Sequence, residues 1–211
     1  NINLIVDYFS KSKVDSYLKS KDFKNKKFSL ITSFAMFYDI NDPNSFCKDV
    51  NSMLEKNGIW IVEFSYFPLL LKNLTFDQIN HEHVTYYTLT TFNNIAKKNG
   101  LKILDVNFNE INGGSAEVIV TKKNSNQRIN EKKLEKIFKQ ERIINNDSYE
   151  KFNLRLQNVK KVINHFFQNT SKIVGYGAST KGNVILQFCN INSDLLKQIC
   201  DVNIEKDGTF T

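Results

Sequence analysis

A short segment of the chain, residues 76–89, concentrates side chains that can transfer protons. It contains His81, Glu82 and His83 in direct succession and shows no helical or strand periodicity. A histidine has an unperturbed pKa of about 6.5, so it can take a proton near neutral pH, and a neighbouring carboxylate can orient it. His83 beside Glu82 therefore has the residue types of a general base. An ordinary polar surface loop is the alternative.

Metal binding is a second interpretation of the same segment. His81 and His83 lie two residues apart and would point to the same side of an extended chain. The third histidine, His165, falls in a predicted helix, and no further ligands stand out in the sequence, so we predict no metal site. The cysteines show no C-x-x-C spacing and indicate neither a zinc site nor a disulfide framework; they are Cys47, Cys189 and Cys200.

A glycine-rich segment, "GYGASTKG" from Gly175 to Gly182, follows a predicted strand and opens a predicted helix. This is the context of a dinucleotide-binding turn, although Thr180 stands where the third glycine belongs. Asp201 follows the next strand near the distance expected of a ribose-binding acid. The segment predicts either a nucleotide-like ligand or a tight structural turn.

The elements that position these residues form an α/β pattern. Apolar runs at 1–9, 27–40 and 59–67 predict buried parallel strands, with a polar helical stretch after the first and a helix over 42–58 after the second. A helix over 90–100 then precedes two extended runs, 101–111 and 115–123. The glycines between these two runs predict a hairpin.

The rest of the chain divides at a polar stretch that begins near residue 122. We expect one domain over 1–123, a linker with helices at 131–145 and 148–169 within 124–170, and a second α/β domain over 171–211. The second domain consists of a strand into the glycine turn, a helix over 179–189 and a strand over 196–203.

Four segments together resemble one protein family. In chain order, "NGIWIVEFSYFP", "FDQINHEHVTYYTL", "INGGSAEVIV" and "GYGASTKG" are similar to stretches of S-adenosylmethionine-dependent sugar C-methyltransferases, which act on nucleotide-linked 4-keto sugars. The resemblance implies a partial class I methyltransferase Rossmann-like sheet that ends in an antiparallel hairpin. A helical connection and a second, incomplete Rossmann-like domain would follow.

The resemblance also implies a mechanism. A methyl group is joined to the carbon beside the ketone, so a base must remove a proton from that carbon, the role implied for His83. The enolate oxygen then needs a hydrogen-bond donor, for which His81 or Tyr86 is the candidate, while Glu82 orients a histidine. The family often has a tyrosine just before this block, whereas this chain has Asn80.

Binding residues follow from the same resemblance. Besides Tyr86, the residues implied for the nucleotide diphosphate keto sugar are Tyr66, Gly113, Gly114, Ser115, Gly175, Gly177 and Lys181, where the glycines also have an explanation as turns. Those implied for S-adenosylmethionine lie at the ends of two predicted strands near the start of the chain: Asp7, Tyr8, Phe9, Ser33 and Phe34. For Ser33 and Phe34, ordinary strand-end positions are the alternative.

Composition limits the other possibilities. The formal charge of +7 comes from scattered lysines rather than one basic stripe, so we predict no nucleic-acid partner. No run approaches the ~20 apolar residues of a membrane span, and we expect a cytoplasmic protein without a membrane partner. The sequence does not indicate an oligomeric state.

The chain starts without methionine, lacks the family's glycine-rich cofactor turn and amino-terminal zinc module, and ends before its last domain is complete. We therefore expect a sequence truncated at both ends. The alternatives are a non-catalytic nucleotide-sugar-binding remnant and a nicotinamide-dependent enzyme that uses the glycine turn.

Overall fold

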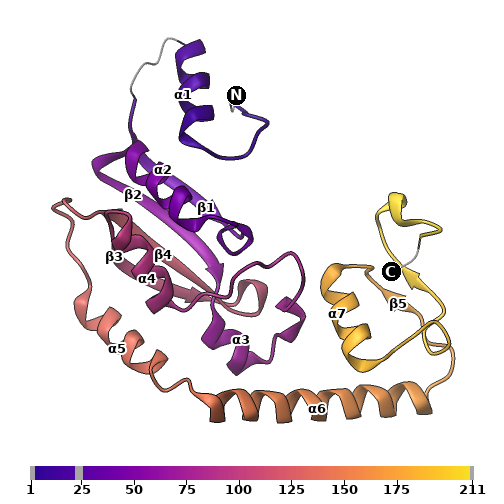
Figure 1. Cartoon of the computed structure of the whole chain (residues 1–211). Helices are drawn as coiled ribbons and strands as arrows, with labels where there is room; N and C mark the ends of the chain where they lie inside the picture. The colour runs from indigo at the N-terminus through magenta and orange to yellow at the C-terminus, as the bar shows by residue number, and fades with distance from the viewer. Residues whose placement is uncertain (1–2, 22–25, 210–211) are drawn as a thin grey trace. The chain divides into compact units, whose positions relative to one another are not determined.

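The computed structural model describes residues 3–21 and 26–209, and these residues form two compact units (Figure 1). The first unit contains the residues up to Phe67 together with Val84–Ile143. The second contains Pro68–His83 and the residues from Ile144 onward. The segment with the His-Glu-His block therefore groups with the C-terminal residues.

The first unit is built on a four-stranded sheet. Its strands are β1 (Phe28–Phe34), β2 (Leu54–Ser65), β3 (Leu101–Asn109) and β4 (Ser115–Lys122), in the order β1-β2-β4-β3. β1 and β2 are parallel, whereas β4 runs antiparallel to both β2 and β3. The predicted parallel pair that finishes in an antiparallel hairpin is confirmed.

Helices of this unit begin and end at recognisable signals. They are α1 (Lys11–Ser20), α2 (Pro43–Met53), α4 (Leu89–Lys98) and α5 (Glu131–Glu141). At α2, the Asp42 carboxylate accepts a hydrogen bond from the Ser45 amide at 3.0 Å, and Pro43 occupies the first turn, as predicted. The helix ends at Met53, several residues before Gly58, which was expected just past its end, because the chain enters β2 at Leu54.

An aromatic core joins the sheet to the helices on one face, where Figure 1 shows α2 and α4. Trp60 and Phe64 lie on the same face of β2 and are fully buried. Phe37 and Phe92 pack against both, with ring centroids 5.0–6.2 Å apart. These rings pack the sheet of the first unit against its helices.

The strand predicted over residues 1–9 is wrong for the residues that the structure describes. Residues 3–9 are irregular, with Val6 89% and Tyr8 93% exposed. Within the described residues, β1 pairs with β2 and no strand pairs with residues 3–9, so this apolar run has no backbone partner.

The second unit contains the long helix α6 (Asn146–Asn169), then β5 (Gly175–Tyr176), α7 (Thr180–Cys189) and β6 (Ile199–Cys200). β5 and β6 pair in parallel, so the predicted strand-helix-strand order is confirmed, with strands of only two residues. The stretch expected to be irregular contains α3 (Phe67–Asn73), whose first residue belongs to the first unit, and a 3₁₀ turn, η2 (Phe76–Gln78). Among the described residues, 3₁₀ turns also occur in the first unit, at η1 (Phe37–Asp39) and η3 (Ile111–Gly113), and in the second unit, at η4 (Ile204–Lys206).

Candidate functional site

The His-Glu-His block forms a turn that Asn80 organises. The Asn80 side-chain oxygen accepts hydrogen bonds from the backbone amides of Glu82, at 2.9 Å, and His83, at 3.2 Å. Asparagine commonly stabilises turns by bonding to amides two or three residues onward. The residue that departs from the family's tyrosine therefore shapes the backbone of the block.

The three block residues differ in exposure. His81 and Glu82 are exposed, whereas the His83 ring is half-buried and its Nδ1 atom is shielded from solvent. The Glu82 carboxylate accepts a hydrogen bond from the Thr180 hydroxyl of α7 at 3.2 Å. Sequence reasoning missed this role of Thr180, because a contact between residues so far apart leaves no local signal.

Aromatic packing holds the segment before the block against α7. The rings of Phe76, in η2, and Phe188, in α7, lie 5.1 Å apart at 56°. Phe188 also lies under the ammonium of Lys160, 5.3 Å from the ring centroid. Both aromatic residues and the block belong to the second unit. The segment that contains the block therefore contacts α7, the helix that follows the glycine turn, through Phe76 and through Glu82.

Tyr66, expected to contact substrate, is only 5% exposed at the end of β2. Its hydroxyl donates to the Glu141 carboxylate at 2.6 Å, and its ring lies 4.8 Å from that of Phe108. Burial and the adjacent Glu141 raise the pKa of Tyr66 above its usual value near 10, so the phenol stays neutral. The other tyrosine, Tyr86, packs its ring 6.5 Å from Phe67.

Glu141 connects several elements of the first unit. Besides Tyr66, its carboxylate accepts the backbone amides of Leu89, at 2.6 Å, and Thr90, at 2.8 Å, and the Thr90 hydroxyl. It thereby binds the first amides of α4, where a negative charge is favoured. Nothing in the sequence predicts this role, because the carboxylate lies on a helix 51 or more residues away.

The hairpin glycines occupy a loop from residue 110 to 114, and both have positive φ, +78° at Gly113 and +133° at Gly114. The Gly114 carbonyl accepts the Tyr66 amide at 3.0 Å. Ser115 is 1% exposed and its hydroxyl donates to the Ile111 carbonyl at 2.9 Å. These residues have a structural task in joining β3 and β4.

The residues expected to hold S-adenosylmethionine fit that cofactor in part. The rings of Tyr8 and Phe34 are 93% and 50% exposed and could flank an adenine. Asp7 instead forms an ion pair with Lys13 at 2.6 Å, which lowers the pKa of Asp7. The Ser33 hydroxyl accepts the indole N–H of Trp60 at 3.0 Å, and both groups are buried.

Phe9, the remaining residue of this set, has its ring 4.7 Å from that of Phe46 on α2. The described geometry therefore offers aromatic surfaces to the cofactor. It does not offer free polar groups at Asp7 or Ser33.

The glycine turn of the second unit is held by its own hydrogen bonds. Gly175 is close-packed against β6, since an added Cβ would lie 3.0 Å from Ile199. The Gly177 amide, at φ +92°, donates to the Cys200 carbonyl at 2.7 Å, and the Ala178 amide donates to Asp201 at 2.8 Å. These two amides are not available to a phosphate.

Asp201 has more than one partner inside the protein. Besides Ala178, it accepts the Asn203 amide at 2.9 Å and the Lys206 ammonium at 3.0 Å. These bonds, the Asn203 amide above all, lower the pKa of Asp201 to about 2. A carboxylate whose oxygens already accept these internal hydrogen bonds is a poor ribose ligand, which disfavours the nicotinamide alternative.

Lys181 lies in the first turn of α7 and is half-buried.

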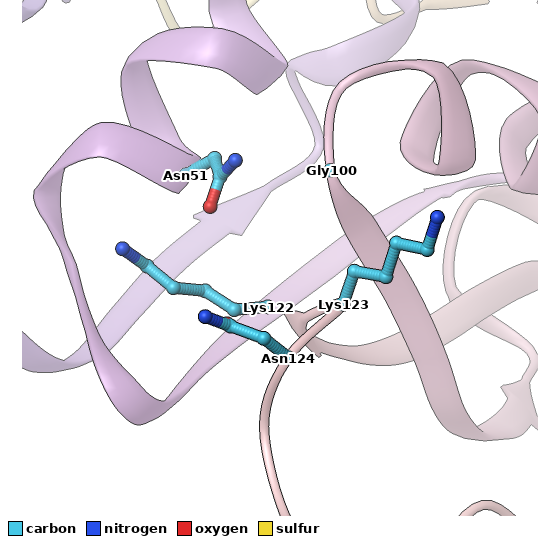
Figure 2. A pocket seen from close by; sticks show the side chains of 5 residues that line it. All are labelled: Asn51, Gly100, Lys122, Lys123 and Asn124. Carbon is cyan, nitrogen blue, oxygen red and sulfur yellow. The ribbon is translucent and has the colours of Figure 1, made fainter.

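A pocket of about 560 Å³ lies in the first unit, at the edge of the sheet where β4 ends and β3 begins (Figure 2). It is lined by Asn51, Gly100, Lys122, Lys123 and Asn124. Figure 2 shows that Lys122 and Lys123 extend in opposite directions. Burial and the nearby Lys27 lower the pKa of Lys122. None of the predicted site residues lines this pocket.

Within residues 3–21 and 26–209, no three histidine, cysteine or acidic side chains meet in an arrangement that could hold a metal ion. None of the described helices is long and apolar enough to cross a bilayer.

Comparison with known proteins defines the class first. Residues 6–106 match a family described as a methyltransferase domain. Residues 110–211 match a second family, described as the C-methyltransferase C-terminal domain. Both matches are to methyltransferase families, and the second is specific to C-methyltransferases.

One curated relative is C-methyltransferase NovU from Streptomyces niveus, which is 34% identical over 89 residues. That alignment covers 42% of this chain and 21% of the relative, so the chain spans a minor part of the relative's length. Among solved structures, magnesium protoporphyrin IX methyltransferase from Synechocystis PCC 6803, with bound SAH, is similar at a TM-score of 0.37 and 11% identity. It aligns over 53% of this chain and 60% of that one. LepI in complex with SAM is similar at a TM-score of 0.39 and 9% identity, over 46% and 27%.

Proposed function

We propose that the protein methylates a nucleotide diphosphate 4-keto sugar at the carbon beside the ketone, with His83 as the base. The observation that carries this proposal is the state of His83: a half-buried imidazole on a turn that Asn80 orders, within a chain that matches methyltransferase families. S-adenosylmethionine, when bound, supplies the electrophilic methyl group.

The geometry of the block supports one assignment of the ring nitrogens. The Nδ1 atom of His83 is buried, so Nε2 is the nitrogen that can face a substrate and accept its proton. Exposed His81, two residues earlier, can place a donor beside the developing enolate oxygen. Tyr86 is the second candidate for that role.

Substrate contacts are proposed for both units. In the second, Lys181 can approach a diphosphate from the first turn of α7, while Gly175 and Gly177 shape the turn before that helix. In the first, Gly113 and Gly114 leave the backbone open to close approach by a sugar. Tyr66 and Ser115 have buried hydroxyls with internal partners, so their contribution would be to shape the loop.

The test is His83→Asn in the natural protein that carries this sequence, assayed for S-adenosylmethionine consumption with a panel of nucleotide-linked 4-keto sugars. Loss of a general base typically costs about a hundredfold to ten-thousandfold in rate, so turnover should fall by that factor while the melting temperature stays close to wild type. His165→Asn is the matched control, because His165 is exposed on α6. Retained turnover in His83→Asn would refute the assignment.

A wild-type protein that binds such sugars without turning them over would instead favour the non-catalytic alternative.

A further inference from the structure

Glu82 is held at two points that come from different parts of the second unit. Its backbone amide is fixed by Asn80 within the turn, and its carboxylate accepts a hydrogen bond from the Thr180 hydroxyl. Thr180 follows Glu82 by 98 residues and is the first residue of α7. η2 and α7 pack together through Phe76 and Phe188, which holds the segment before Glu82 against the helix that Thr180 begins.

We propose that Thr180 is a positioning residue, which sets the Glu82 carboxylate and through it the orientation of the adjacent His83. The inference rests on the proposed function, because it assigns Thr180 a part in the same proton transfer. It also gives a task to the residue that replaces the third glycine of the "GYGASTKG" turn. A glycine at this position could not donate the hydrogen bond.

The donor is well placed for this role. Threonine is branched at Cβ, so few rotamers are open to it, and its hydroxyl keeps a narrow range of directions. The start of α7 is itself fixed, because the Ser179 hydroxyl accepts the Gly182 amide at 3.1 Å.

The acceptor depends on that donor. The amino end of a helix attracts a carboxylate, which favours Glu82 at this position. An exposed glutamate without such a partner would sample many rotamers and would orient a neighbouring histidine poorly.

Steady-state kinetics on the natural protein test the proposal with Thr180→Val, which removes the hydroxyl at similar volume. We expect kcat to fall about fivefold, with the KM for the keto sugar within twofold of wild type. Thr180→Ser, which keeps the hydroxyl, should recover at least half of wild-type kcat. Thr170→Val is a matched control at an exposed threonine just after α6 and should leave kcat unchanged.

A double-mutant comparison shows whether Thr180 acts through Glu82. In a Glu82→Ala background, Thr180→Val should lower kcat by less than twofold, because the group that it positions is already gone. A full fivefold loss in that background would overturn the proposal. So would unchanged kcat in Thr180→Val alone, or a change confined to KM.

A second measurement separates this inference from the proposed function. Hydrogen exchange of the amides of Glu82 and His83 needs no substrate, and Thr180→Val should raise their exchange rates severalfold over those in Thr170→Val. If the protein has no turnover with any keto sugar, faster exchange still supports positioning by Thr180. Unchanged exchange would overturn it.

Discussion

The Glu141 carboxylate is 8% exposed and accepts hydrogen bonds from Tyr66 and from the first residues of α4, so Glu141→Ala should destabilise the first unit strongly. Alanine would leave the Tyr66 hydroxyl and the Leu89 amide buried without an acceptor. Each stranded buried donor costs about 1–3 kcal/mol. Allowing for partial relaxation around them, we expect a loss of about 3 kcal/mol in the free energy of unfolding.

Urea denaturation followed by tryptophan fluorescence measures this loss, because Trp60 lies in the core of the same unit. The urea concentration at the midpoint of unfolding should fall, while the slope of the unfolding free energy against urea concentration stays constant. This combination indicates a change in stability alone. Tyr66→Phe removes one of the bonds and should cost about 1 kcal/mol. The two substitutions should be non-additive by at least about 0.5 kcal/mol, because they disrupt the same contact.

Glu135→Ala is the matched control, since Glu135 is exposed on the same helix and should change stability by less than about 0.5 kcal/mol. A loss below about 1 kcal/mol in Glu141→Ala, or full additivity with Tyr66→Phe, would refute the idea that this carboxylate links α5 to α4 and to the end of β2.

Two further predictions concern the turns. Asp201 has a pKa of about 2 in the folded protein against about 3.9 for an unfolded aspartate, so its bonds stabilise the fold above pH ~4 and this stabilisation is lost as the pH falls through about 2. Asp201→Asn should therefore lower the melting temperature at pH 6, and the difference from wild type should shrink between pH 4 and pH 2; a constant difference would contradict the argument. Gly114→Ala should cost about 1–3 kcal/mol in urea denaturation, because alanine is strained at φ +133°, and a neutral result would show that the loop can rearrange.

Much of the secondary structure could be predicted from local patterns. The proline and aspartate at the start of α2, the glycines of the hairpin and the strand-turn-helix around "GYGASTKG" all lie where the sequence indicated. Local signals succeed at such places because capping and positive φ depend on the residues themselves. The apolar run at the start of the chain was misread because a strand also needs a partner strand, and periodicity does not show whether one is present.

Residue types by themselves determined which chemistry the sequence predicts. The adjacent histidines and glutamate indicated proton transfer, and the order of the motifs indicated the C-methyltransferase family, which the family comparisons support. Only the tertiary structure decided which groups are available for that chemistry. It engaged Tyr66, Ser115, Asp7 and Asp201 with internal partners, and it brought Thr180 to Glu82 across 98 residues. The physical reason is that a hydrogen bond depends on distance in space, which packing sets, whereas residue type only determines what each group can donate or accept.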